Sequence, residues 1–122
     1  MFEIEKTFSF EAGHTLTHHD GKCKNPHGHS YVLKIALRKK ALEPSGPKKG
    51  MVMDFGDISA HVKPMIEKYL DHAWLNTTLE TETPTAEFIA EWIFKHLEKK
   101  LPGLYKVTIF ETATSSASYC VS

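Results

Sequence analysis

Residues 27–40 read HGHSYVLKIALRKK, and the alternation of polar and apolar side chains along them decides the fold class. Successive side chains of a β-strand point to opposite faces of a sheet, so every second residue shares a face. The pattern therefore predicts a half-buried strand over residues 28–40. The residues expected on its buried face are His29, Tyr31, Leu33, Ile35 and Leu37.

Residues 2–12 alternate in the same way, and a polar segment at residues 15–26 separates them from the strand above. The polar segment carries two turn signals, Asp-Gly at 20–21 and Asn-Pro at 25–26. We therefore expect a first strand that pairs with the second across a loop. One face of this strand is expected to carry Phe2, Ile4, Phe8 and Phe10, and the other Glu3, Glu5 and Thr7.

Two helices are predicted in the middle of the chain. Residues 56–70 place apolar side chains at helical spacing, and Pro64 among them predicts either a kink or a late first turn. Residues 84–101 form a second amphipathic segment, for which Thr83 is the expected N-cap. A short extended piece is expected before both helices, at residues 51–55.

Alternation returns near the C-terminus and predicts strands at residues 104–112 and 117–121. In the first of these, Val107, Ile109 and Glu111 share a face. The order is strand, strand, helix, helix, strand, strand. This order predicts an α+β fold with an antiparallel hairpin at each end and the helices on one face of the sheet.

Composition sets limits on the function. The chain has 122 residues, 41% hydrophobic and 25% charged, which predicts one domain over residues 1–122. The formal net charge is zero, which argues against nucleic-acid binding driven by bulk charge. No apolar run approaches the ~20 residues of a membrane span, and the charged start MFEIEKTFSF is unlike a signal peptide. We therefore expect a cytoplasmic protein without a membrane partner, in which Cys23 and Cys120 stay reduced.

Histidine is the unusual residue type, with eight in the chain. His27 and His29 are two apart on a predicted strand, so both rings point to one face, and His14 closes the neighbouring strand. Three protein ligands with an open fourth position are typical of a catalytic zinc site. Imidazole ligands favour zinc, although iron, nickel and copper stay open on ligand type alone. His18 and His19, in the same loop, are expected to be solvated.

Two further features have alternative interpretations. Cys23 precedes His27 by four residues, so it could be a fourth zinc ligand, or a thiolate beside the metal that acts as a base. Asp71 and His72 end the first predicted helix. Their position favours a cation near a helix C-terminus over a carboxylate that orients an imidazole for proton transfer.

Glu111 is expected on the apolar face of its strand, where a carboxylate needs a partner. The partner could be a basic side chain or a ligand that offers N–H donors. The edge of a pterin or a guanine offers two such donors side by side. Asp54 is expected to be a turn or capping residue.

Taken together, these segments resemble the 6-pyruvoyltetrahydropterin synthase family. The resemblance spans nearly the whole chain, in the family's order. It implies the tunnelling fold, or T-fold, with a four-stranded antiparallel sheet, two helices on one face and the order ββααββ. It also implies subunits whose sheets join into a barrel, commonly a hexamer made of two trimers, with active sites at subunit contacts. The matching segments are FEAGH ending at His14, CKNPHGHSY at 23–31, GMVMDF at 50–55, LDHAWLN at 70–76, PTAE at 84–87 and FETATSSASY at 110–119.

The resemblance also implies roles for individual residues and a substrate, 7,8-dihydroneopterin triphosphate. It assigns Cys23 as the catalytic base and Asp71 with His72 as a proton relay, against the helix-end interpretation of that pair. No motif for the triphosphate is evident, and Lys22 and Lys24 are the candidates. The remaining implied roles are zinc ligands for His14, His27 and His29, pterin anchor for Glu111, and lining of the pterin pocket for Thr85 and Glu87.

Three residues separate Cys23 from His27, a spacing that resembles the bacterial 6-carboxy-5,6,7,8-tetrahydropterin synthases of queuosine biosynthesis. This resemblance implies a zinc-dependent lyase that releases acetaldehyde and triphosphate. One alternative is a 6-pyruvoyltetrahydropterin synthase, which eliminates triphosphate and keeps all the side-chain carbons. A second alternative is a zinc-stabilised binding module without turnover, in which Cys23 is a metal ligand.

Overall fold

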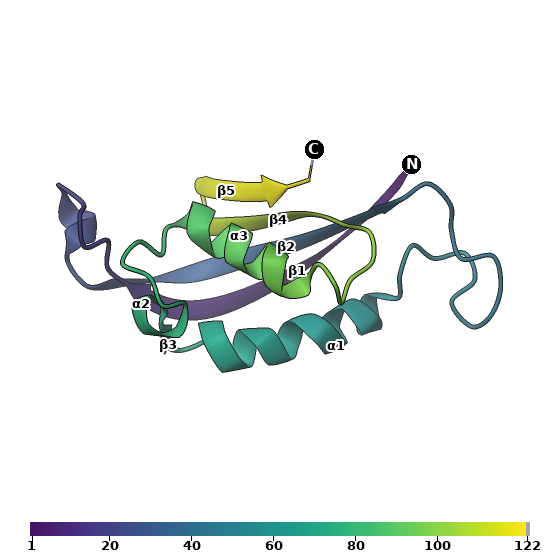
Figure 1. Ribbon diagram of the computed structural model, residues 1–122, viewed down its shortest axis with the longest axis horizontal. Helices are drawn as coiled ribbons and strands as arrows, with labels where there is room; N and C mark the ends of the chain where they lie inside the picture. The colour runs from purple at the N-terminus through teal and green to yellow at the C-terminus, as the bar shows by residue number, and fades with distance from the viewer. Residues whose placement is uncertain (122) are drawn as a thin grey trace.

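The computed structural model describes residues 1–121 and shows an α+β fold built on one mixed sheet (Figure 1). The strands lie in the order β3-β1-β2-β4-β5. Neighbouring strands pair antiparallel, except that β3 runs parallel to β1. The bounds are β1 Phe2–His14, β2 His27–Lys39, β3 Ala73–Trp74, β4 Leu104–Thr112 and β5 Ser115–Cys120.

The β1–β2 hairpin is the longest pairing in the sheet. Its register runs unbroken from Phe2 opposite Lys39 to His14 opposite His27. Both strands were predicted, and each is longer at the loop end than the alternation indicated. The extension matters because it places His14 and His27 inside the sheet, where paired backbone fixes their positions.

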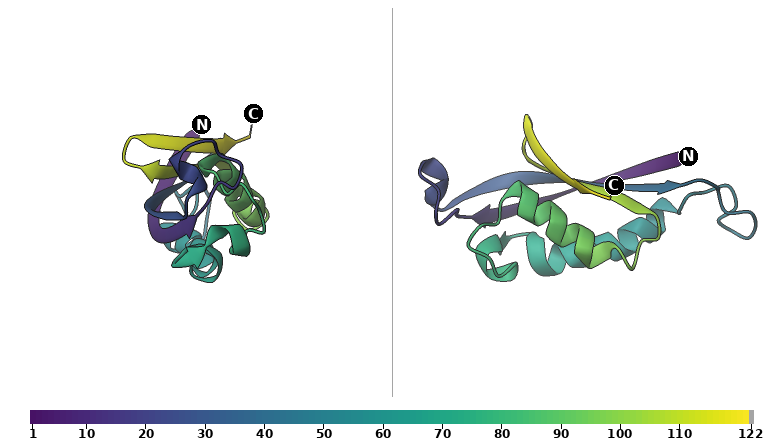
Figure 2. Two further views of the ribbon diagram at one scale, coloured as in Figure 1. Left: turned by 90° about the vertical axis from the view of Figure 1, so that its left-hand side faces the viewer. Right: turned by 45° about the horizontal axis from the view of Figure 1, so that its top comes forward.

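Two helices, α1 (Phe55–Met65) and α3 (Ala86–Leu97), lie along the same face of the sheet (Figures 1 and 2), as predicted. Their apolar sides pack against the inward residues of the strands in one hydrophobic cluster. The central strands contribute many of the buried side chains, among them Phe10, Tyr31, Leu33, Ile35, Leu37, Val107 and Ile109.

The helix boundaries differ from those predicted. Pro64 lies inside α1, near its end, and a wide helical turn, η2 (Ile66–Leu70), continues the chain. The N-cap of α3 is Thr85 and not Thr83, because the Thr85 hydroxyl accepts the bond from the Phe88 N–H. The expected extended piece at 51–55 is wrong, since residues 52–53 form a bend and α1 begins at residue 55. Asp54 caps α1, as expected.

Three short elements were not predicted, namely β3, η1 (Lys22–Lys24) and α2 (Leu75–Thr78). Strand β3 places Ala73 beside Ala12 and Trp74 beside Gly13, so residues 70–76 lie next to the end of β1. The strand is too short to show any periodicity in the sequence. Among residues 1–121, no helix has the length and apolar character required to cross a membrane.

Candidate functional site

A cluster of side chains lies at the end of the β1–β2 hairpin. One ligand atom from each of four residues, His14, His27, His29 and Glu111, lies within 4.8 Å of the corresponding atoms of the others. The hairpin places the histidines, because His14 and His27 are direct partners across the strands and His29 is two residues further along the same face. Glu111 enters from β4, on the face that Val107 and Ile109 occupy.

Backbone carbonyls hold two of the three imidazole rings. The Nδ1 atom of His14 lies 2.7 Å from the carbonyl oxygen of Pro84, and the Nδ1 atom of His27 lies 2.7 Å from that of Asn25. A carbonyl can only accept, so each Nδ1 must carry the proton and donate it. The Nε2 atoms therefore present lone pairs, which is the usual arrangement of a histidine that binds a metal.

The third ring supplies an independent indication of a cation. The Nε2 atom of His29 is buried and has no hydrogen-bond partner among residues 1–121. The Glu111 Oε1 atom lies 3.2 Å from it, which is within ion-pair range but lacks hydrogen-bond geometry. Since a buried polar atom without a partner is costly, a metal ion would satisfy both groups. The three imidazole nitrogens are a donor set that fits zinc, and the Glu111 carboxylate lies within the same group.

The protonation states also suit a metal. Burial lowers the pKa of His14 and of His29, and the two pKa shifts are opposed by the charge of Glu111. The other histidines of the cluster lower both pKa values further. The neutral ring is the form that donates a lone pair, so this environment favours the ligand form over imidazolium.

Tyr31 lies at the buried side of the cluster. Its side chain is fully buried, stacks on Phe10 at 4.9 Å between ring centroids, and places its hydroxyl 3.4 Å from the Nδ1 atom of His14. Burial raises the pKa of Tyr31, and the nearby charge of Glu111 raises it further. The phenol therefore stays neutral, and its hydroxyl lies next to the His14 ring.

The predicted base, Cys23, lies in the loop beside the cluster and outside the group of four ligand residues. It belongs to η1 and is partly buried, and its carbonyl accepts from the Leu16 N–H at 2.9 Å. Lys22 and Lys24 flank it and are exposed. The interpretation of Cys23 as a base stays a prediction.

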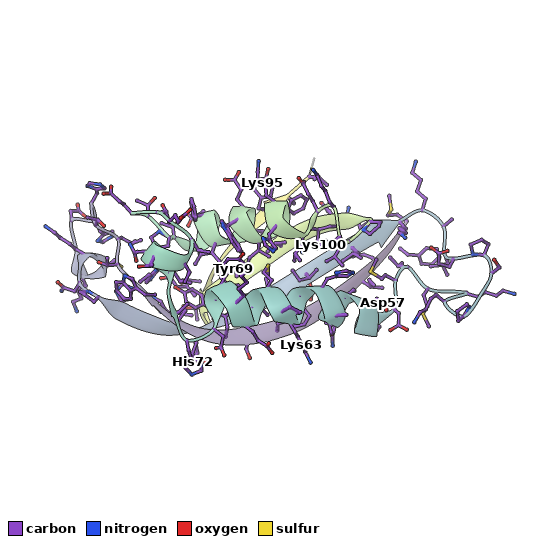
Figure 3. The ribbon with its side chains drawn as sticks, turned by 60° about the horizontal axis from the view of Figure 1, so that its bottom comes forward. Asp57, Lys63, Tyr69, His72, Lys95 and Lys100 are labelled. Atoms are coloured by element: carbon purple, nitrogen blue, oxygen red, sulfur yellow. The ribbon has the colours of Figure 1, made fainter. Side chains whose placement is uncertain are left out.

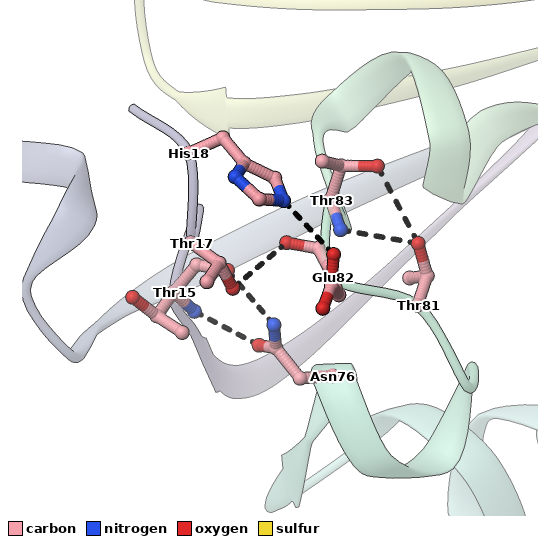
Figure 4. A network of polar contacts seen from close by, with 7 residues as sticks. All are labelled: Thr15, Thr17, His18, Asn76, Thr81, Glu82 and Thr83. Atoms are coloured by element: carbon pink, nitrogen blue, oxygen red, sulfur yellow. Dashed lines mark hydrogen bonds and ion pairs between the residues drawn. The ribbon is translucent and has the colours of Figure 1, made fainter. Parts of the chain in front are cut away.

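Contacts with residues 76–83 hold this loop in place (Figure 4). Thr15 and Asn76 form two hydrogen bonds of 2.9 Å, one in each direction between backbone and amide. His18 pairs with Glu82 at 2.9 Å, although both side chains are more than 70% exposed. His18 is thus a solvated surface residue, as expected, and the pair contributes little to stability.

Asp71 and His72 form an ion pair in which the His72 Nδ1 atom lies 3.0 Å from the Asp71 Oδ2 atom. The other oxygen, Oδ1, accepts from the Glu11 N–H at 2.9 Å, and this bond, followed by the His72 contact, lowers the pKa of Asp71. His72 adopts a positive φ of 55°, and its side chain is 80% exposed, pointing away from the ribbon (Figure 3). An oriented, accessible imidazole can exchange protons with a ligand.

A cavity of about 750 Å³ is bordered by His72, by β3 and by the paired ends of β1 and β2. His72 and Trp74 border it on one side, and His27 and His29 on the other. Glu111 does not border this cavity but lines a second one, of about 650 Å³, on the far side of β2. His27 and His29 thus border the same cavity as His72, whereas Asp71, His14 and Glu111 do not border it.

The two remaining predicted residues lie at the start of α3. The Thr85 hydroxyl is engaged as the helix cap, and Glu87 is exposed in the first turn. Neither borders the larger cavity within the part of the chain described. Sequence reasoning missed three contributors, which are the Pro84 carbonyl, the Tyr31 hydroxyl and the Trp74 ring. Only Tyr31 gave a signal, because its spacing placed it on the face of His29.

Comparisons with known proteins agree with this geometry. Residues 3–121 match the family described as 6-pyruvoyl tetrahydropterin synthase. A Synechocystis protein named 6-carboxy-5,6,7,8-tetrahydropterin synthase is 48% identical over 98% of this chain and 93% of its own length. A Haemophilus influenzae protein of the same name is 37% identical over 98% of this chain and 99% of its own. The solved structure of Caenorhabditis elegans 6-pyruvoyl tetrahydropterin synthase superposes with a TM-score of 0.83 at 31% identity, covering 99% of this chain and 96% of that one.

Proposed function

The chain belongs to the 6-pyruvoyl tetrahydropterin synthase family, and we propose that it is a zinc-dependent 6-carboxy-5,6,7,8-tetrahydropterin synthase of queuosine biosynthesis. The observation that carries the proposal is the convergence of His14, His27 and His29, in a chain that also holds an accessible His72 in contact with Asp71. The substrate is 7,8-dihydroneopterin triphosphate. The fold is accordingly the tunnelling fold of that family.

The reaction balances with one molecule of water. The bond between the first and second side-chain carbons breaks, and the two outer carbons leave as acetaldehyde. The triphosphate ester is cleaved, and the remaining carbon becomes the carboxylate. The remaining carbon loses three electrons, of which the pterin ring gains two and the acetaldehyde carbons gain one, so no external reductant is required.

His14, His27 and His29 would hold the zinc ion through their Nε2 atoms. The bonds from Nδ1 to backbone carbonyls indicate this for His14 and His27, and the buried, unpaired Nε2 atom indicates it for His29. When bound, zinc supplies Lewis-acid polarisation of substrate oxygens. Tyr31 and the Pro84 carbonyl keep the His14 ring in place. Because these side chains are already held in position, little free energy is lost in ordering the metal-binding histidines when the substrate binds.

Proton transfer falls to Cys23 and to the Asp71–His72 pair. The Cys23 thiolate accepts a proton from a side-chain carbon of the substrate, and the His72 imidazole exchanges protons with the side-chain oxygens. Asp71 keeps the His72 ring in one tautomer, because its Oδ2 atom accepts from Nδ1. General acid–base catalysis of this kind contributes about 10²–10⁴-fold.

Glu111 is the proposed anchor of the pterin ring, with Thr85 and Glu87 as further pocket residues. The Glu111 side chain is 25% exposed, so a ligand can reach it, and one of its oxygens already faces His29. A carboxylate has two oxygens and about four lone-pair sites, so it can accept from ring N–H donors while it stays beside the metal site.

The competing product is the 6-pyruvoyl compound, the name that the C. elegans structure carries. Two observations favour the carboxy product for this chain. The Synechocystis and H. influenzae relatives are named for it, and the gap of three residues between Cys23 and His27 matches the bacterial pattern.

We further propose a homo-oligomer, a hexamer made of two trimers. Strand β3 covers β1 only at Ala12 and Gly13, and β5 has no partner on its outer side within residues 1–121. Open edges of this kind readily pair with another chain. Light scattering of the purified protein gives the subunit number. A cytoplasmic location stays a prediction from composition.

Product analysis tests the function. The zinc-loaded protein is incubated with 7,8-dihydroneopterin triphosphate, and the mixture is analysed by mass spectrometry with a separate assay for acetaldehyde. We expect 6-carboxytetrahydropterin and acetaldehyde in equal amounts. A pyruvoyl product without acetaldehyde would replace this function by the alternative, and recovery of unchanged substrate would leave only a binding role.

A further inference from the structure

Trp74 is a large apolar residue that the fold leaves 39% exposed. Among residues 1–121, five other large apolar side chains are also exposed, but only Trp74 borders the cavity that is lined by His72, His27 and His29. An exposed indole beside reactive groups indicates a ligand contact more than a packing defect, because burying an aromatic side chain of this size is strongly favourable.

The position of the ring is fixed by the sheet. Trp74 is the register partner of Gly13 in the parallel pairing of β3 with β1. The Cε3 and Cζ3 atoms of the indole both lie 3.2 Å from where a Cβ atom on Gly13 would be, so the benzo edge rests on the bare backbone of β1. A Cβ atom at position 13 would force the ring to move by a few tenths of an ångström. Gly28, opposite Gly13 on β2, extends the flat surface.

The ring lies on the face of β1 opposite to that of His14, because Gly13 and His14 are neighbours in a strand. It therefore leaves the histidine cluster unobstructed. Trp74 is also only two residues from His72, and both line the same cavity. A ligand that occupies this cavity would therefore lie next to both Trp74 and His72.

We propose that Trp74 is the stacking platform for the planar bicyclic ring of the substrate. This inference rests on the proposed function and adds a binding residue to it. An indole supplies a rigid π-face at low entropic cost, and a pterin presents a flat ring of matching size. The cavity of about 750 Å³ is large enough for such a ring with its side chain.

The test uses the zinc-loaded full chain and neopterin, an oxidised pterin that keeps the ring and the side-chain hydroxyls. Trp74→Ala weakens neopterin binding by about 10- to 100-fold, the range expected for loss of one aromatic stacking partner. Trp74→Phe keeps the affinity within about three-fold, since a smaller aromatic face remains. Both variants retain full zinc content, which separates stacking from damage to the metal site.

The other tryptophan of the chain provides the matched control. The sequence contains two tryptophans, and Trp92 packs between Tyr69 and His96 in the helix layer. Trp92→Phe leaves the affinity unchanged and makes Trp74 the sole indole. Neopterin then quenches the remaining fluorescence strongly, whereas in Trp74→Phe the emission of Trp92 changes much less. This measurement needs no alanine variant and stands even if Trp74→Ala does not fold.

Three results would overturn the inference: unchanged affinity in Trp74→Ala, equal losses in Trp74→Phe and Trp74→Ala, or equal quenching of the two indoles. If the wild-type protein still forms product in any of these cases, only the role of Trp74 falls. If the wild-type protein neither binds neopterin nor converts the triphosphate substrate, the proposed function and this inference fall together.

Discussion

The Nδ1 atom of His14 lies 2.7 Å from the carbonyl oxygen of Pro84, which follows it by 70 residues. This buried bond ties the end of β1 to the segment that leads into α3. It also decides which nitrogen of His14 is free to bind a metal. The helix layer and the metal cluster are therefore built as one unit, and a change in either is expected to affect the other.

Loss of a histidine ligand should abolish zinc binding. His29→Ala is expected to weaken zinc affinity by more than about 100-fold. Substitution of a residue that only hydrogen-bonds to a metal ligand already costs up to about 100-fold in metal affinity. Metal analysis after dialysis measures it. His18→Ala is the control, because His18 pairs with Glu82 on the surface, and its zinc content should stay at one ion per chain. Full occupancy in both variants would remove the metal assignment.

Cys23→Ala should abolish product formation and keep the metal. The reason is that Cys23 lies beside the four-residue cluster and not among its ligand atoms. Zinc content and turnover are measured on the same preparation. Should the variant lose its zinc along with its activity, Cys23 is a ligand and the site is structural.

His72→Ala should lower kcat by about 10²–10⁴-fold, with a much smaller effect on the affinity for substrate. Asp71→Asn should act in the same direction, because the amide cannot hold the His72 Nδ1 proton as the carboxylate does. Steady-state kinetics separates kcat from KM, and neopterin binding reports affinity directly. Wild-type kcat in both variants would return the pair to a role at the end of a helix.

Glu111→Gln should weaken pterin binding by about 10- to 100-fold, corresponding to the roughly 1.5–3 kcal/mol of a charge-assisted hydrogen bond. Zinc should be retained, since three histidine ligands remain. Calorimetric titration with neopterin provides the affinity. If affinity is unchanged and zinc is lost, the carboxylate serves the metal and not the ring.

Acid should destabilise the zinc-free protein partly through His96. Its ring stacks on Trp92 at 5.0 Å and contacts Tyr69, and burial, with smaller contributions from Lys100 and Lys68, lowers its pKa below 6.5. The unfolded chain binds the proton more readily, so stability is full above pH 6.5 and falls as the pH drops towards the lowered pKa. His14 and His29 act in the same direction.

Denaturant unfolding at several pH values measures this effect. His96→Gln should flatten the dependence of the unfolding free energy on pH without removing it, because the two cluster histidines remain. An identical pH dependence in wild type and variant would show that His96 titrates alike in folded and unfolded chains.

The sequence was sufficient for features that repeat locally. Alternation predicted the strands and placed Glu111 inward with Val107 and Ile109, because a two-residue period is visible within one strand. The register that sets His14 opposite His27 follows from the same pattern. The clustering of the three histidines is therefore predictable from their spacing along two paired strands.

Features that depend on distant segments could not be predicted. Strand β3 has two residues, and its pairing with β1 depends on how η2 ends. Thr83 and Thr85 are chemically identical candidates for a cap, and only the position of the Phe88 N–H chooses between them. The bond to the Pro84 carbonyl cannot be predicted from a pattern of side chains, because every residue has a backbone carbonyl.

The left-handed backbone at His72 has a consequence for engineering. A non-glycine residue at a φ of 55° costs free energy, which neighbouring contacts must offset. Glycine or asparagine there would relieve the strain and raise the melting temperature while removing the imidazole. Selection for thermal tolerance alone would therefore favour chains that lack the proposed proton-transfer group at this position. The sequence with the highest melting temperature and the sequence with the highest proposed activity are therefore expected to differ at residue 72.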